Sequence, residues 1–218
     1  MLLEMRGATT VEIAARCEAI CLGARAVVDE ARLRVRQSKR QILDHEAALL
    51  YTIARRVVPP GGLVLEIGTA FGFSAVMLAH AQPLASIVTL NPNGDEFPVA
   101  RANLAHLPTV APLKIHSWDY LKAYHGPDLS LVFVDGDHKH VELDLPWFDW
   151  LTPGGMIVFH DYSPEGPKRP TPHVVEVVDK FARDLGRPPD LIVVDDGRRG
   201  VVGFERHLGE KWRHRGGQ

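Results

Sequence analysis

The chain has 218 residues, of which 45% are hydrophobic and 24% charged, and its formal net charge is −2 at pH 7. These values are typical of one globular domain of ordinary size, and they argue against a strongly basic nucleic-acid binder or a membrane-surface protein. Charged residues interrupt every apolar run near the N-terminus, so we expect neither a signal peptide nor a membrane span. The two cysteines, Cys17 and Cys21, form no disulfide framework, and we expect a protein of the reducing cytoplasm.

Apolar residues at helical spacing predict helix over about residues 10–57, and a Pro-Pro-Gly-Gly turn then ends it. A basic cluster in this region is interpreted as the solvated end of a helix. Its members are Arg32, Arg34, Arg36, Lys39 and Arg40. Asp44, His45 and Glu46 are likewise expected on a solvated helix face, with a lid over the functional site as the alternative.

From residue 63 onward, short apolar runs alternate with helical stretches at about 73–81, 96–106, 140–151 and 173–185. The runs are Leu63–Ile67, Ile87–Leu90, Leu131–Val134, Met156–Phe159, Leu191–Val194 and Val201–Phe204. This alternation indicates a parallel sheet covered by helices on both faces. Residues 195–200 are too few for a crossover helix, so the last two strands are expected to form an antiparallel hairpin.

The first strand leads into a turn that contains Gly68 and Gly72, and a helix follows from about Phe73. Glycine permits backbone angles and close approaches that a Cβ would block. The first turn of the helix offers unpaired N–H groups to an anion, either a dinucleotide pyrophosphate or an amino-acid carboxylate. Two features argue against a dinucleotide, because the turn is Gly-x-Ala-x-Gly and the acid Glu66 precedes it.

Carboxylates and histidines gather after two further strands. They are Asp135, Asp137, His138 and His140 after one strand, and His160 and Asp161 after the next. Open α/β sheets bind ligands at the carboxyl ends of their strands. A single Asp there often caps a helix, but two such groups favour a functional site. Carboxylate oxygens suit hard divalent cations, and imidazole shifts the preference toward Mn, Fe or Zn.

The stretch Leu-Glu-Ile-Gly-Thr-x-x-Gly-x-Ser at 65–74 resembles the first motif of class I S-adenosylmethionine-dependent methyltransferases, and its wording is closest to the small-molecule O-methyltransferases. The resemblance covers about residues 46–205. It implies an α/β Rossmann-like fold with a mostly parallel seven-strand sheet, a C-terminal antiparallel hairpin and N-terminal helices. We therefore expect a helical segment at 1–58 serving as a lid or oligomer contact, a methyltransferase domain at 59–208 and a polar tail at 209–218.

The resemblance also implies a set of cofactor-binding residues. They are Glu66, Gly68, Ala70, Gly72, Ser74, Asn91, Trp118, Asp119 and Asp135. Ser74 would bond the methionine carboxylate, and Glu66 would hold the loop or the amino group. Asn91 stands where the family has an acid for the ribose hydroxyls, and it lacks the charge-assisted strength of a carboxylate. A plain turn role for Asn91 is the alternative. Trp118 or Asp119 would contact the adenine.

The series Val-Asp-Gly-Asp-His at 134–138, followed by Phe-His-Asp-Tyr at 159–162, is similar to metal-dependent O-methyltransferases that act on catechols and macrolide sugars. This similarity implies Asp135 and Asp161 as metal ligands and His138 as general base. His160 stands where some relatives have a third, acidic ligand. It is therefore a candidate ligand, with neutral lining as the alternative. His140 is a weaker candidate base, and the loop Ser163–Pro172 is expected to form part of an acceptor pocket.

The expected function is transfer of a methyl group from S-adenosylmethionine to a hydroxyl of a small molecule, such as a sugar, a phenol or a natural-product intermediate. Mg²⁺ or Mn²⁺ would assist, and no nucleic acid or membrane partner is expected. A homodimer through the N-terminal helices is considered from their apolar stripes. Two alternatives remain open: an NAD(P)-dependent oxidoreductase, and a non-catalytic small-molecule-binding protein on a methyltransferase fold.

Overall fold

The structure is a computed structural model that describes residues 10–35, 42–163, 172–195 and 199–212, with side chains of the first helix described from residue 22. The helices are α1 (Thr10–Arg34), α2 (Asp44–Val57), α3 (Phe73–Ala81), α4 (Phe97–Leu104), α5 (Ser117–Ala123), the 3₁₀ helix η1 (Val141–Trp150) and α6 (Pro172–Leu185). The strands are β1 (Leu63–Ile67), β2 (Ser86–Leu90), β3 (Val110–Leu113), β4 (Leu129–Val134), β5 (Leu151–Phe159), β6 (Leu191–Asp195) and β7 (Arg199–Glu205).

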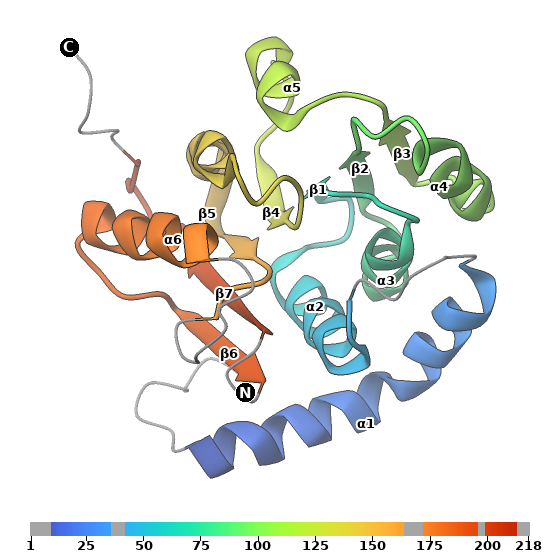
Figure 1. The fold of residues 1–218 in the computed structure, drawn as a ribbon, viewed down its shortest axis with the longest axis horizontal. Coiled ribbons are helices and arrows are strands. Elements are labelled where there is room, and N and C mark those ends of the chain that lie inside the picture. Colours follow the sequence, from blue (N-terminus) through green and yellow to red (C-terminus); the bar gives the residue numbers. More distant parts are fainter. Residues whose placement is uncertain (1–9, 36–41, 164–171, 196–198, 213–218) are drawn as a thin grey trace.

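The strands form one seven-stranded sheet in the order β3-β2-β1-β4-β5-β7-β6. Strands β1 to β5 pair in parallel, while β7 pairs antiparallel with both β5 and β6. Helices cover both faces, with α1, α2 and α3 on one side and α5, η1 and α6 on the other (Figure 1). The predicted Rossmann-like sheet with a closing antiparallel hairpin is confirmed.

Alternate residues of the central strands supply two separate cores. In β1, Val64 packs with the α1–α3 layer, whereas Leu65 and Ile67 pack with the α5–η1–α6 layer. This is the period-two alternation of a strand covered on both faces. Burial of each such aliphatic side chain stabilises the fold by roughly 1.5–3 kcal/mol. The two cores hold the carboxyl ends of β1, β2 and β4 at one edge of the sheet.

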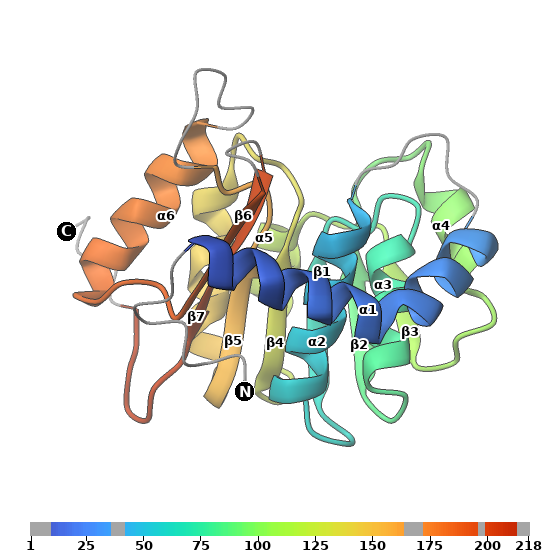
Figure 2. The ribbon, with the colours of Figure 1, turned by 90° about the horizontal axis from the view of Figure 1, so that it is seen from below.

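Helix α1 runs along the outside of α2 and α3 (Figure 2). Ala24, Val28, Ala31 and Val35 form its buried stripe, at the spacing expected for one helix face. The predicted N-terminal helical segment therefore shares its core with the sheet domain. None of the helices in the described ranges is both long and apolar enough to cross a membrane.

The interpretation of the basic cluster as solvated is wrong for Arg32. Its guanidinium lies 3.5 Å over the Phe73 ring, and its Nε is 3.1 Å from Asp44 Oδ1. Arg32 thus ties α1 to the starts of α2 and α3 by cation–π and ion-pair contacts. Arg34 is exposed, as expected, and pairs with Glu30. Arg36, Lys39 and Arg40, together with the side chains of Cys17 and Cys21, lie outside the described residues.

Several elements differ from the sequence-based expectation. The edge strand β3 and the short helix α5 were not predicted, since β3 is brief and contains Pro112. Pro is tolerated at a sheet edge because its missing N–H needs no partner there. The expected helix at 140–151 is a 3₁₀ helix with Pro146 inside it. Trp212, in the stretch expected as a polar tail, is buried against Phe181.

Candidate active site

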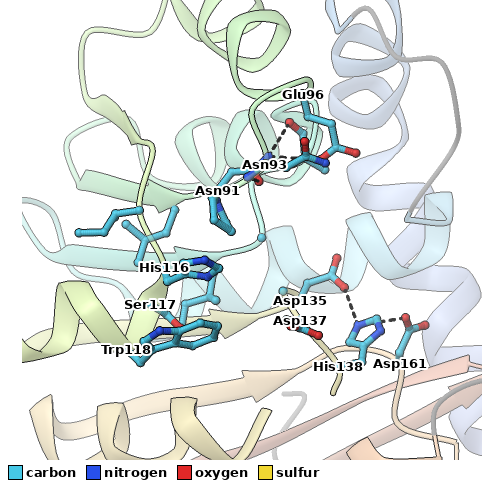
Figure 3. A pocket seen from close by; sticks show the side chains of 17 residues that line it. Asn91, Asn93, Glu96, His116, Ser117, Trp118, Asp135, Asp137, His138 and Asp161 are labelled. Atoms are coloured by element: carbon cyan, nitrogen blue, oxygen red, sulfur yellow. Dashed lines mark hydrogen bonds and ion pairs between the residues drawn. The ribbon is translucent and has the colours of Figure 1, made fainter. Parts of the chain in front are cut away.

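A cavity of about 670 Å³ opens at the carboxyl ends of β1, β2 and β4. Its volume lies within the range of small-molecule sites, roughly 300–1,000 Å³. Four loops and the end of β5 line it, and Figure 3 shows the carboxylate–histidine cluster on one side and Asn91 and Glu96 on the other. This is the edge at which open α/β sheets bind ligands. The residues predicted from two separate sequence motifs therefore face one space.

The glycine-containing turn after β1 forms the floor of this cavity. Gly68 has φ +107°, and a Cβ there would lie 2.0 Å from the carbonyl oxygen of Asp135. The turn can therefore pack against the end of β4 only with glycine at this position. Gly72 has φ +89° and precedes α3. Gly68 and Ala70 line the cavity, whereas Gly72 and Ser74 lie outside its lining.

Glu66 lies beneath the turn and does not line the cavity. Its side chain is fully buried and accepts a hydrogen bond from the Thr89 hydroxyl. Burial raises the pKa of Glu66 to about 7, against the opposing effect of hydrogen bonds from Ser74 and Thr89. Thr89 also lies 2.6 Å from the Thr69 hydroxyl. This chain of contacts ties the turn to β2, which fits the loop-holding role expected for Glu66.

Asn91 directly follows β2 and lines the cavity, and both polar groups of its side chain form hydrogen bonds with neighbouring residues. Its Oδ1 accepts the N–H of Asn93 at 2.9 Å, which makes the turn expected from the sequence. Its Nδ2 lies 3.3 Å from Oε2 of Glu96 and 3.4 Å from the carbonyl oxygen of Ala70. Glu96 also lines the cavity, and sequence reasoning missed it.

The end of the loop after β3 and the first turn of α5 supply an aromatic wall. Trp118 lines the cavity, and its ring stacks on His116 with centroids 4.2 Å apart. Beneath them, the Ser117 hydroxyl donates to the buried carboxylate of Asp144. Asp119, the other candidate adenine contact, is exposed and bonds Lys122 at 2.9 Å. It is not among the residues that line the cavity.

The carboxylate–histidine cluster lies on the opposite side of the cavity. His138 Nε2 is 3.6 Å from Asp135 Oδ1 and 3.4 Å from Asp161 Oδ2 (Figure 3). One ligand atom from each residue lies within 4.8 Å of the others, a spacing that could hold a metal ion. Asp161 and Ala70 are the non-glycine residues with positive φ in the described ranges, and both line the cavity. Backbone strain of this kind concentrates at functional sites.

The charges of this cluster depend on one another. Burial would raise the pKa of Asp135, but the charge of His160 and the bonds from His138 and His160 outweigh it and lower the pKa to about 2. The bond to Asp135 raises the pKa of His138 above its usual value, against the effect of burial. Asp135 is therefore ionised near neutral pH, and His138 is a stronger base than an isolated imidazole.

His160 contacts two members of the carboxylate–histidine cluster, Asp135 and Asp161, but is not itself part of the group that could hold a metal ion. Its ring is buried, with Nδ1 2.9 Å from Asp135 Oδ1 and Nε2 3.2 Å from Glu46 Oε1. The expectation of a solvated helix face is therefore wrong for Glu46, which is only 2% exposed. A sequence signal existed, because Glu46 stands at helical spacing from the apolar Leu50 and Ile53 of α2.

The remaining candidates lie at the margin of the site. Asp137 lines the cavity, whereas His140 is exposed and bonds Asp137 with its Nδ1 2.8 Å from Oδ2. Tyr162 follows Asp161 in the chain, and its hydroxyl donates to Asp179 at 2.8 Å. Of the loop expected to form an acceptor pocket, residues 164–171 lie outside the described part of the chain.

Comparisons with known proteins agree with this geometry. Residues 65–162 match the profile of a methyltransferase domain family. The SAH-bound methyltransferase PaMTH1 of Podospora anserina has a TM-score of 0.63 at 19% identity, covering 91% of this chain and 97% of its own. The O-methyltransferase TomG of Streptomyces achromogenes, in complex with SAM, has a TM-score of 0.61 at 19% identity, covering 87% and 88%.

The fold is also shared with methyltransferases of another kind. An rRNA methylase from Streptococcus thermophilus has a TM-score of 0.59 at 13% identity, covering 79% of this chain and 99% of its own. The search of curated protein sequences finds no match to this chain. The domain match covers residues 65–162, less than half of the 218-residue chain, and the solved structures of methyltransferases share its fold. The chain is therefore similar to S-adenosylmethionine-dependent methyltransferases in this domain and in its fold.

Proposed function

We propose that the protein transfers the methyl group of S-adenosylmethionine to a hydroxyl of a small molecule. The observation that carries this proposal is one cavity that joins the glycine turn of β1 to the cluster of Asp135, His138 and Asp161. The first feature suits the methionine end of the cofactor. The second suits activation of an oxygen nucleophile. The methyltransferase match disfavours the oxidoreductase alternative, whose three-glycine fingerprint is also absent.

The cofactor would lie across the ends of β1, β2 and β3. The backbone at Gly68 and Ala70 would hold its methionine portion, and Trp118 would contact its adenine. Gly72, Ser74 and Glu66 lie outside the lining, so we assign them to shaping the turn rather than to direct contact. S-adenosylmethionine supplies an electrophilic methyl group, and the protein must place an acceptor oxygen in line with it.

A divalent cation fits the cluster. Two carboxylate oxygens and one imidazole nitrogen converge there, and His138 Nε2 is buried without a hydrogen bond of good geometry to the described residues. A cation so held would lower the pKa of an acceptor hydroxyl. Carboxylates suit Mg²⁺ or Mn²⁺, and the imidazole favours Mn²⁺ over Mg²⁺. His160 would not be a ligand, because both of its ring nitrogens face carboxylates.

Two roles can be assigned to His138, and they cannot operate at the same time because both use Nε2. Its Nε2 can accept the proton of the acceptor hydroxyl, and Asp135 strengthens it as a base. The same nitrogen can instead bind the cation beside Asp135 and Asp161. We assign the base role to His138 in the metal-free protein, with Asp135 and Asp161 orienting the ring.

Calorimetric titration tests the cofactor assignment. S-adenosylmethionine and S-adenosylhomocysteine are titrated into the wild-type protein with EDTA, Mg²⁺ or Mn²⁺, and NADH serves as control. We expect saturable binding of both sulfur compounds and none of NADH. If the folded protein binds neither sulfur compound under any of these conditions, the proposal is wrong.

Methyl transfer is then measured with labelled S-adenosylmethionine and a panel of catechols, simple phenols and sugars. Label recovered in an acceptor ether supports O-methylation. Cofactor binding without transfer to any acceptor, including RNA, would favour the non-catalytic alternative. Transfer to RNA alone would contradict the small-molecule assignment, which rests on the near-neutral net charge of the chain.

Two further properties belong to this proposal. We place the protein in the cytoplasm because two cysteines are too few for the disulfide framework typical of secreted proteins. A homodimer through α1 remains a proposal, and Leu22 and Leu33 are exposed on that helix. Sedimentation analysis of the wild type against L22E/L33E tests it, since the dimer requires that the variant sediments more slowly.

A further inference from the structure

The acid that should bind the cofactor ribose is missing from the end of β2, where Asn91 stands. A ribose presents two neighbouring O–H donors, and a single carboxylate can accept both with charge-assisted hydrogen bonds. The side-chain oxygen of Asn91 already accepts the Asn93 N–H at 2.9 Å. Asn91 is therefore poorly suited to accept two hydroxyl groups.

A carboxylate is nevertheless present on this side of the cavity. Four acids line the cavity, and Asp135, Asp137 and Asp161 belong to the opposite side, after β4 and β5. The fourth, Glu96, lies beside Asn91 (Figure 3), with its Oε2 3.3 Å from Asn91 Nδ2. It is half-buried at the start of α4.

We propose that Glu96 is the ribose-binding acid of this protein and that Asn91 holds it in place. The assignment rests on the proposed function, because it assumes the cofactor lies across β1, β2 and β3. The order of these strands puts the end of β2 between the loop of Gly68 and the loop of Trp118. The middle of an extended nucleoside–amino acid ligand falls there. Asn91 donates to one carboxylate oxygen of Glu96, and the carboxylate retains lone pairs for both hydroxyls.

Affinity for S-adenosylhomocysteine and its 2′-deoxy analogue measures this contact directly. The wild type should bind the deoxy analogue about tenfold more weakly, because a carboxylate acceptor is left without its donor. The variant Glu96→Gln should bind S-adenosylhomocysteine about 10- to 100-fold more weakly than the wild type, and its preference for the 2′-hydroxyl should fall below about threefold. The loss of this preference separates ribose contact from a structural effect.

Two further variants sharpen the test. Asp95→Asn removes the adjacent exposed acid at the same helix start and should leave affinity unchanged. The exchanged variant N91D/E96Q places the carboxylate on β2 and should recover most of the lost affinity. If Glu96→Gln binds both ligands as the wild type does, the Glu96 assignment is overturned while the proposed function stands. Failure of the wild type to bind S-adenosylhomocysteine would instead overturn both.

Discussion

Glu46 Oε1 of helix α2 lies 3.2 Å from Nε2 of His160, although neither side chain is more than 2% exposed. Burial would lower the pKa of His160, but Asp135 and Glu46 outweigh it and raise the pKa well above the usual value. Burial would likewise raise the pKa of Glu46, but its bond to His160 holds that pKa below the usual value. The pair is therefore ionic, and it joins the N-terminal helices to the edge of the site.

Glu46→Gln should destabilise the protein by about 3 kcal/mol, because the buried charge of His160 then has one carboxylate partner, Asp135, in place of two. Urea unfolding at pH 7 measures this change. The control is Glu142→Gln, which breaks an exposed pair with His173 at 3.0 Å and should cost less than about 1 kcal/mol. Equal effects of the two substitutions would contradict the ionic pair.

A second variant tests whether the cost of Glu46→Gln comes from His160. The double variant E46Q/H160Q should lose less stability than the sum of the single variants, since the uncompensated charge is gone. Additive losses would show that Glu46 and His160 act independently, and the pair would then have no role in fixing the site edge.

His138→Gln should reduce methyl transfer by about 10²- to 10⁴-fold, the usual contribution of a general base. Affinity for S-adenosylhomocysteine should change little, because His138 lies across the cavity from Asn91 and Trp118, where we propose that the cofactor binds. The matched control is His140→Gln, which removes an exposed histidine bonded to Asp137. Similar rates for the two variants would rule out His138 as the base.

The pH profile of the wild type adds an independent check on His138. Its raised pKa means that the proton-accepting form appears only above the usual pH of an imidazole, near 6.5. The rate should therefore rise with pH through a value above that point, and His138→Gln should abolish this limb. Weaker Mn²⁺ binding by the same variant would instead favour the ligand role.

The bounds of the two elements that flank the glycine-containing turn could be predicted from the sequence, because their signals are local. The apolar run Leu63–Ile67 and the helix at 73–81 coincide with β1 and α3. Strand β3 was missed because its apolar run is only four residues long and contains Pro112, a residue that argues against a strand. Edge strands bury little, so their sequences carry little pattern.

The candidate site could be predicted only in part, because only some of its residues follow a strand directly in the sequence. Asp135 and Asp161 follow buried strands, and a parallel sheet must bring such residues to one edge. The partners of His160 and Asn91 come from other elements: Glu46 from α2, and Glu96 from the start of α4. The contact of Glu46 depends on how α2 packs against the sheet, and that of Glu96 on the path of the loop before α4, and single-sequence patterns specify neither.

Gly68→Ala should destabilise the protein by about 3 kcal/mol or more and abolish cofactor binding, because the new Cβ would collide with the backbone of Asp135. Gly154→Ala separates this collision from backbone strain, since Gly154 also has positive φ, +83°, but has no atom within 4 Å of an added Cβ. It should cost about 1–2 kcal/mol. Thermal unfolding and S-adenosylhomocysteine titration measure both, and equal losses would contradict the close packing of the turn.

Asp144→Asn should make the protein more stable at pH 8 but not at pH 4. Burial raises the pKa of Asp144 to about 7, against the bond from Ser117. In the unfolded chain an Asp titrates near 3.9, so between about pH 4 and 7 the folded state binds more protons and stability falls as pH rises. Asparagine removes this cost and still accepts the Ser117 hydroxyl.

The gain from Asp144→Asn should therefore grow from pH 4 to pH 7 and then level off at up to about 4 kcal/mol. Urea unfolding of the wild type and of Asp144→Asn across this range measures the gain. Groups that titrate alike in both proteins contribute equally to the two free energies of unfolding and cancel in their difference. Asp128→Asn, at an exposed position, should show a flat difference over the same range. A flat difference for Asp144→Asn as well would mean that Asp144 ionises at its ordinary pKa, and that a full negative charge lies beneath the Trp118 wall of the cavity.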